Sequence, residues 1–327
     1  MVFKRLLGAI GAGGPSVDTA LDGGAVLPGG MLTGRVWLRG GSAAAEVEHI
    51  GLELLARVEA EHEEGESEGE VVFERFTVGG GFRLGPEEER EVPFAVPLPW
   101  ETPVTELYGQ PLGIVLGVRT EVGLAGARDK GDLDPLAVRP LAVQEAVLEA
   151  LGQLGFGFRS ADLEYGRIGG TGQRLPFYQE VELAPAPQYA HAVNEIELTF
   201  LASPAGLEVV LEADKRGGFS AGHDALTRFT VRHEDAHALD WNSEVDGWIS
   251  RLIAHREAYG THAAYGHGGY DGHGGYDGHE DGHHRSGPGL GTAVAAGAAG
   301  LALGVVGGMV AAEVVDEIGD FFEGDED

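Results

Sequence analysis

The chain of 327 residues contains no cysteine, and this absence sets the first limits on its chemistry. Disulfide bonds, cysteine-ligated zinc and thiol catalysis are all excluded. The N-terminus has a basic pair and a short apolar stretch at residues 6–12. That stretch is shorter than the apolar core of a signal peptide, and no clear Ala-x-Ala cleavage site follows it. We therefore expect a cytoplasmic protein.

Basic residues are also scarce in this sequence. Lys and Arg number 22 against 53 Asp and Glu, which gives a formal net charge of −31. Nucleic acids and anionic lipid headgroups bind proteins through Lys and Arg, so we expect no nucleic-acid partner. The acids are expected to form a solvated surface, with an acidic docking face as the alternative.

Several motifs of enzymes and ion-binding proteins are missing. The glycine-rich pieces at 79–81 and 169–172 are not followed by Gly-Lys-Ser/Thr, so they do not form a P-loop. The sequence has no Gly-x-Ser-x-Gly, which leaves a hydrolase nucleophile elbow unsupported. The acidic stretch 59–70 lacks the residue order of an EF-hand. We expect it to be a solvated hairpin loop, with weak cation binding as the alternative.

The pattern of residues 17–139 predicts an antiparallel β-sandwich. Short runs alternate apolar and polar residues, and Gly and Pro turns separate them. Leu32, Val36 and Leu38 are the expected inward positions of one such run. The run 91–98 carries two prolines. Because proline cannot donate to a sheet ladder, this run should form an edge strand.

Two helical patterns interrupt the strands. Residues 141–154 place apolar side chains at helical spacing, and Gly155 is expected to end this helix, which we interpret as a linker packed between two halves. Strand-like runs then resume as far as residue 233. A second helix, capped by Ser243 and extending to Tyr259, closes the body.

The predicted fold is mainly β, with two tandem antiparallel β-sandwiches joined by a helix, then a C-terminal helix and a low-complexity tail. This pattern divides the chain into four segments. They are an N-terminal β-sandwich (1–140); the linker helix, C-terminal β-sandwich and closing helix (141–259); a His/Gly-rich linker (260–285); and a Gly/Ala-rich apolar segment with an acidic end (286–327).

Short motifs follow one another in an order that resembles a known family. They are FKRLL at 3–7, the Pro-Gly turn and GRVWLRGG within 28–41, FAVPLPWET at 94–102, PFYQE at 176–180, LEVVLEAD at 207–214, and the Asp-Trp and Trp-Ile pairs at 240–241 and 248–249. On these residues the chain resembles the bacterial sporulation-control proteins, which have an arrestin-like fold. The resemblance covers most of residues 1–257. It implies two arrestin-like sandwiches, no cofactor or reaction, and regulation through protein contacts.

One motif has possible catalytic chemistry. The sequence His-Glu-Asp-Ala-His at 233–237 matches the zincin pattern H-E-x-x-H. On an α-helix, His233 and His237 would share one face and ligate zinc, Glu234 would activate water, and Glu257 would be a candidate third ligand. The preceding residues alternate as in a strand, and the Glu-Asp pair favours a turn. A zinc-dependent hydrolase is therefore an alternative and not our main interpretation.

A histidine-rich tract is the better metal candidate. The unit Gly-His-Gly-Gly-Tyr-Asp occupies 266–271 and repeats at 272–277. Imidazole binds Zn, Ni and Cu, but ordering a flexible tract costs entropy, so the affinity should be low. A solvated linker and a metal-buffering or pH-sensitive linker both fit this pattern. The candidate metal ligands are His262, His267, His273, His279, His283 and His284.

The end of the chain has an unusual composition. Residues 286–312 carry no charge, whereas residues 313–327 carry eight acids and no base. The uncharged run could span a bilayer as a helix, and the glycines at 300–308 have the four-residue spacing that lets helices approach closely. The many glycines disfavour a helix in water. A self-associating segment and a membrane-associated helix within 286–322 both remain open, and the acidic end suits docking to a partner.

We therefore expect a non-enzymatic regulatory protein with no catalytic residue and no cofactor. It should act through contacts with one or more protein partners, and the tail suggests homo-oligomerisation or membrane contact. The alternatives are the zinc-dependent hydrolase and a metal-buffering protein that works through the histidine tract.

Overall fold

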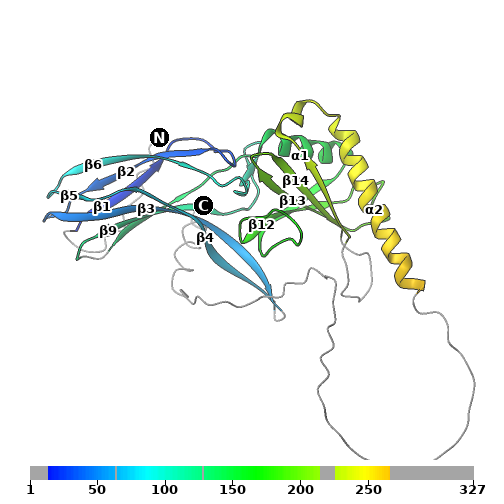
Figure 1. Cartoon of the computed structure of the whole chain (residues 1–327), viewed down its shortest axis with the longest axis horizontal. Coiled ribbons are helices and arrows are strands. Elements are labelled where there is room, and N and C mark those ends of the chain that lie inside the picture. The colour runs from blue at the N-terminus through cyan, green and yellow to red at the C-terminus, as the bar shows by residue number, and fades with distance from the viewer. Residues whose placement is uncertain (1–13, 63–64, 127–128, 214–224, 266–327) are drawn as a thin grey trace, which may run out of the picture.

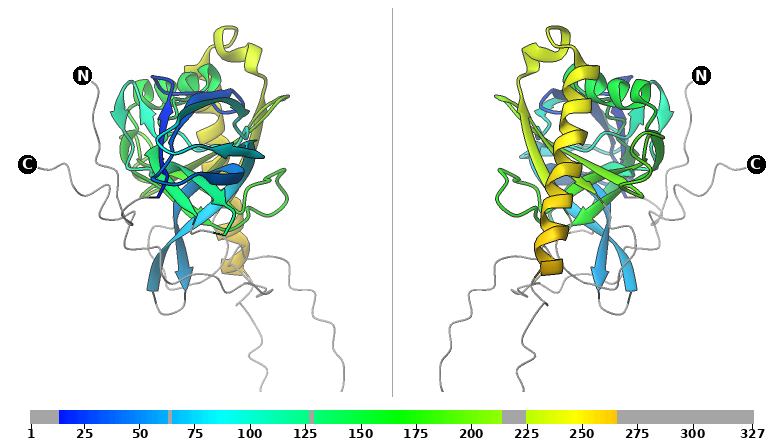
Figure 2. Two further views of the ribbon diagram at one scale, coloured as in Figure 1. Left: turned by 90° about the vertical axis from the view of Figure 1, so that its left-hand side faces the viewer. Right: turned by 90° about the vertical axis from the view of Figure 1, so that its right-hand side faces the viewer.

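The computed structural model describes residues 14–62, 65–126, 129–213 and 225–265. Figure 1 shows two lobes side by side along the long axis, and Figure 2 shows the long closing helix on the outer flank of the second lobe. The prediction of a mainly β protein with a helix between two β-rich halves and a closing helix is confirmed.

The first lobe is a sandwich of two β-layers. Strands β1, β2 and β6 form one antiparallel layer in that order, which packs over β3 and β9 of the other layer. The strands of this lobe are β1 (Ser16–Leu21), β2 (Met31–Arg39), β3 (Ala45–His62), β4 (Gly65–Gly79), β5 (Phe82–Leu84), β6 (Glu89–Pro97), β7 (Glu106–Leu107), β8 (Gln110–Pro111), β9 (Leu116–Leu124) and β10 (Lys130–Pro135).

Alternating side chains along β2 build the core of the first lobe. Leu32, Val36 and Leu38 are buried at 3% exposure or less, whereas Trp37 between them is 43% exposed. Burial of this kind is worth about 1.5–3 kcal/mol for each large aliphatic side chain. The predicted inward positions are therefore confirmed.

Strand β6 lies at an edge of the three-stranded layer, as its prolines predicted. Pro93 and Pro97 lie opposite Arg35 and Met31 of β2. A proline has no backbone N–H, so a second neighbouring strand would lose a hydrogen bond at each of these positions.

Within the acidic stretch 59–70, residues 59–62 and 65–70 are strand and not loop, which corrects the sequence-based prediction. Strands β3 and β4 extend to within two residues of each other, and their register pairs Glu59 with Glu68 and Arg57 with Glu70. Arg119 of β9 donates a hydrogen bond to Glu70 over 2.9 Å. Backbone pairing and this cation offset the repulsion that made the stretch resemble a solvated loop.

The second lobe is one antiparallel sheet with two helices against it. The strands follow the order β11-β12-β13-β14-β15, and apolar side chains of the helices and of one sheet face form a common core. The elements are α1 (Ala142–Leu154), β11 (Gly157–Tyr165), β12 (Phe177–Ala184), β13 (Ile196–Ser203), β14 (Gly206–Ala213), β15 (Ala225–Val231), the 3-10 helix η1 (His233–His237) and α2 (Trp241–Tyr265).

Helix α1 belongs to the core of the second lobe. Its residues Val143, Val147 and Leu151 are buried in the same apolar cluster as Trp248 of α2. The helix ends at Gly155, whose φ of 97° is accessible to glycine at little cost. The predicted helix end at Gly155 is thus confirmed. The helix was predicted to pack as a linker between the two halves, but it packs beside α2 within the second lobe.

Helix α2 begins earlier than its sequence suggested. It starts at Trp241, and the carboxylate of Asp240 accepts a hydrogen bond from the Ser243 backbone N–H over 3.4 Å. The predicted cap at Ser243 is therefore wrong, because the preceding aspartate already provides an acceptor. Among the described residues, none of the helices has the length and hydropathy needed to cross a membrane.

Strand pairing joins the two lobes. Strand β11 of the second lobe lies parallel to β3 of the first, with Glu164 beside Glu59. As a result, the sheet of the second lobe continues one layer of the first in the order β10-β9-β3-β11-β12-β13-β14-β15.

Candidate functional site

The face of the second sheet that points away from α1 and α2 is acidic. Along β11, β12, β13 and β14, the acids alternate with apolar residues that point to the other face of the sheet, whereas β15 has no acid. The strand register then places the acids of neighbouring strands side by side. We call this surface the acidic face, and its carboxylates are Asp162, Glu164, Glu180, Glu182, Glu197, Glu208 and Glu212.

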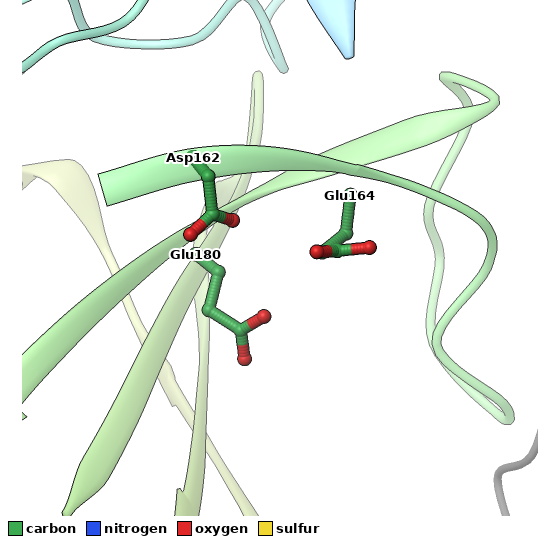
Figure 3. A group of neighbouring side chains, drawn as sticks. All are labelled: Asp162, Glu164 and Glu180. Carbon is green, nitrogen blue, oxygen red and sulfur yellow. The ribbon is translucent and has the colours of Figure 1, made fainter. Parts of the chain in front are cut away.

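Three of these carboxylates lie especially close together. Asp162 and Glu164 come from β11 and Glu180 from the neighbouring β12, and Figure 3 shows all three side chains on one side of the sheet. Their oxygens lie within 4.8 Å of one another. Oxygen ligands of this kind suit Ca²⁺ or Mg²⁺. In the part of the chain that the structure describes, no other group of three or more His, Asp or Glu side chains is as close.

Protonation compensates part of this negative charge. Burial, the hydrogen-bonded Glu197 and the nearby Asp162 raise the pKa of Glu180 to about 10. At neutral pH Glu180 therefore carries a proton. Burial and the charge of Glu180 also raise the pKa of Tyr178 on the same strand. Protonation of Glu180 thus lowers the negative charge of the cluster, and we assign no metal to it.

Arginines lie near the ends of the acidic face. Arg228 of β15 lies 3.6 Å from Glu208, and Arg159 of β11 is ion-paired with Glu195. Neither arginine lies within the central group of Asp162, Glu164 and Glu180.

A cavity of about 630 Å³ opens between the two lobes, next to the acidic face. Trp100 and Phe73 of the first lobe line it, together with residues of the hairpin between β13 and β14. Glu208 and Thr230 line both this cavity and the end of the acidic face. We call this cavity the inter-lobe pocket.

Glu101 fixes the rim of the inter-lobe pocket. Its carboxylate accepts hydrogen bonds from the backbone N–H groups of Arg174 and Leu175 over 2.8 Å and 2.9 Å. The loop that connects β11 and β12 is thereby tied to the turn after β6. The rim is held by charge-assisted hydrogen bonds, which are stronger than neutral ones.

Replacing Glu101 by glutamine is expected to lower the free energy of unfolding by about 1 kcal/mol, because the new amide nitrogen cannot accept a hydrogen bond. Urea denaturation measures the change. The matched control is Glu89→Gln, at an exposed position of β6, for which a change within about 0.5 kcal/mol is expected. Equal stability of the two variants would contradict the anchoring role of Glu101.

The residues of the zincin motif do not assemble a zinc site. They lie in the five-residue 3-10 helix η1, which has about three residues per turn. His233 and His237 therefore point in different directions, whereas an α-helix would align them. His233 Nε2 lies 2.8 Å from the carbonyl oxygen of Ser203, and its ring packs 5.1 Å from that of Trp100. His233 thus joins the two lobes, and the zinc-hydrolase alternative has no support in this geometry.

The predicted metal ligands of the histidine tract stay predictions. His262 lies in α2 as its helix approaches Tyr265, and nothing is described of its side chain. The other five, His267, His273, His279, His283 and His284, lie outside the described residues, as does the uncharged run 286–312.

Comparison with known proteins identifies the family. The Spo0M family model, described as SpoOM protein, matches residues 3–217. The sporulation-control protein spo0M of Bacillus subtilis (strain 168) is 35% identical over 215 residues, which cover 65% of this chain and 81% of that protein. The crystal structure of Spo0M from Bacillus subtilis matches with a TM-score of 0.64 and 30% identity, over 74% of this chain and 98% of that one. The chain belongs to the Spo0M family.

Sequence reasoning missed both the acidic face and the inter-lobe pocket. A signal for the face was present, because Glu180 and Glu182, Glu197, and Glu208 and Glu212 occupy alternate positions in their strands. Only the register shows that these acids lie next to one another. The pocket has no local signal, since its wall combines residues as distant as Phe73 and Thr230.

Proposed function

We propose that this chain is a non-enzymatic, cytoplasmic regulatory protein that acts by binding a partner protein, with the acidic face as its main contact surface. Family membership supports the regulatory role, since the relative that it resembles is a sporulation-control protein. The observation that carries the choice of surface is the continuous row of carboxylates on a sheet face that neither helix covers.

Charge determines which partner this surface suits. A protein with a net charge of −31 and a concentrated acidic face attracts a basic partner and repels acidic ones. Such steering raises the association rate and weakens with salt. The partner is therefore expected to present Lys and Arg.

A charge-reversal experiment tests this proposal. The full chain serves as bait in a host lysate, and a partner that is reproducibly captured is purified for titration calorimetry. We expect Glu182→Lys combined with Glu212→Lys to weaken binding at least about tenfold, because two carboxylates of the face become cations.

The matched control reverses two exposed acids of the first lobe, Glu89→Lys combined with Glu121→Lys. This control changes the net charge equally and should change affinity by about twofold or less. Equal weakening by both double variants would show that only net charge matters and would overturn the assignment of the acidic face.

A further inference from the structure

The inter-lobe pocket has the size and lining of a ligand site. Its volume of about 630 Å³ lies within the usual range for such sites. Apolar and charged side chains share its lining, and four of the apolar residues are buried. The apolar lining residues are Phe73, Pro99, Trp100, Leu175, Leu201, Ala202, Pro204, Ala205 and Leu207.

The charged lining is mostly negative. It includes Glu74, Glu101 and Glu208, with Arg174 as the single base. The side chain of Arg174 is exposed to solvent, whereas its backbone N–H is held by Glu101. Arg228, which lies 3.6 Å from Glu208, compensates part of this charge, and the carboxylate of Glu101 already accepts two backbone hydrogen bonds. The surroundings of the pocket still hold more carboxylates than guanidinium groups. This balance favours a cation over an anion.

The aromatic wall is held in place before any ligand binds. Trp100 packs on His233, and it lies so close to Gly29 that a Cβ on that glycine would come within 2.4 Å of the indole. Phe73 makes an edge-on contact with Phe177 at a centroid distance of 5.6 Å. Gly29 and His233 thus cover the faces of the Trp100 ring, so the indole gives the pocket apolar surface, and the attraction for a cation comes from the carboxylates. A preorganised wall reduces the entropy cost of binding.

We infer that the inter-lobe pocket binds an arginine or lysine side chain, flanked by apolar residues, from an extended segment of a basic partner protein. The aliphatic part of the side chain would lie against the apolar lining, with its charge beside the carboxylates of Glu74 and Glu208. This inference rests on the proposed function and adds the specific anchor that the acidic face lacks. Because the pocket has walls from both lobes, one bound segment would contact both.

Nuclear magnetic resonance of the full chain tests the anchor directly. The four tryptophans give four indole N–H signals, and Trp100→Phe identifies the one in the pocket. The probe is the blocked peptide acetyl-Ala-Leu-Arg-Leu-Ala-amide. Its control contains citrulline in place of arginine, which keeps the shape and removes the charge. We expect the arginine peptide to shift the Trp100 signal in a saturable way and the citrulline peptide to bind about tenfold more weakly.

Variants of the pocket complete the test. Glu74→Gln combined with Glu208→Gln should weaken the arginine peptide at least about fivefold, whereas Glu89→Gln combined with Glu121→Gln should not. An unmoved Trp100 signal, equal affinity for the citrulline peptide, or tighter binding of a peptide with glutamate at the central position through Arg174 would each overturn the inference.

The outcomes also separate this inference from the proposed function. If the pocket variants bind the purified partner normally while Glu182→Lys with Glu212→Lys does not, the pocket is wrong and the acidic face stands. If the acidic-face variants bind normally, the proposed surface fails, and the Trp100 titration still decides whether the pocket accepts a cationic side chain.

Discussion

Replacing Trp248 by alanine is expected to lower the free energy of unfolding by about 4 kcal/mol, the largest effect among the substitutions considered. Trp248 of α2 is 3% exposed. Its ring stacks on Phe229 of β15 at 4.8 Å and meets Trp241 edge-on at 6.1 Å. Truncation removes both contacts and leaves a cavity between the helix and the sheet. Urea denaturation followed by far-ultraviolet circular dichroism measures the loss.

The control for Trp248 is another large apolar residue near the start of α2. Leu239 is 38% exposed, so Leu239→Ala should cost less than about 1 kcal/mol. A similar cost for the two substitutions would show that α2 does not depend on the stacked aromatic contact. A transition in two separate steps for Trp248→Ala would show that the lobes unfold independently.

Replacing Glu180 by glutamine is expected to stabilise the protein by at least about 2 kcal/mol near pH 8. Burial and the neighbouring Glu197 and Asp162 raise the pKa of Glu180 from 4.5 to about 10. Between these values the folded state holds a proton that the unfolded chain releases. The contribution of this carboxyl to stability is therefore full below the unfolded pKa and is lost progressively as the pH rises towards the folded pKa. Glutamine does not ionise, so its contribution to stability does not fall as the pH rises. Its amide still offers Glu197 a hydrogen-bond donor.

Denaturation at several pH values between about 5 and 8 measures this effect, and the advantage of Glu180→Gln should grow with pH. Glu53→Gln provides a control of opposite sign. Burial opposes ionisation there, but hydrogen bonds from Arg119 and Arg75 hold the pKa of Glu53 below its ordinary value. Removing that carboxylate should destabilise the protein, most strongly above its unfolded pKa. A stabilising effect of Glu180→Gln that does not change with pH would contradict the protonated state.

Local patterns predicted the elements of this fold well. Alternation identified the inward residues of β2, and two prolines identified the edge strand β6. The ends of β3 and β4 were not predicted, because the acidic pattern of 59–70 resembled a loop. Arg119, which compensates the charge of Glu70, comes from a strand distant in the sequence. For the zincin motif, the neighbouring residues gave the right answer. The strand that ends at Val231 predicted correctly that residues 233–237 would not continue as an α-helix.

The candidate site was beyond local reasoning because it depends on strand register. Strands β11 to β14 each show an alternation of acids and apolar residues, but the proximity of Glu180 to Glu197 and Asp162 follows from pairing across three strands. The pocket depends further on how two lobes meet. Neither the strand register nor the contact between the lobes can be predicted from the spacing of residues along one segment.

The parallel contact between β3 and β11 has a mechanical consequence. The bridge between Glu164 and Glu59 and the hydrogen bonds of Glu101 to the loop between β11 and β12 cross the boundary between the lobes, and His233 packs its ring on Trp100 there. Swinging one lobe against the other would shear these hydrogen bonds together. We therefore expect the two lobes to move little against each other. A segment that enters the inter-lobe pocket must then match its width without a closing motion of the lobes.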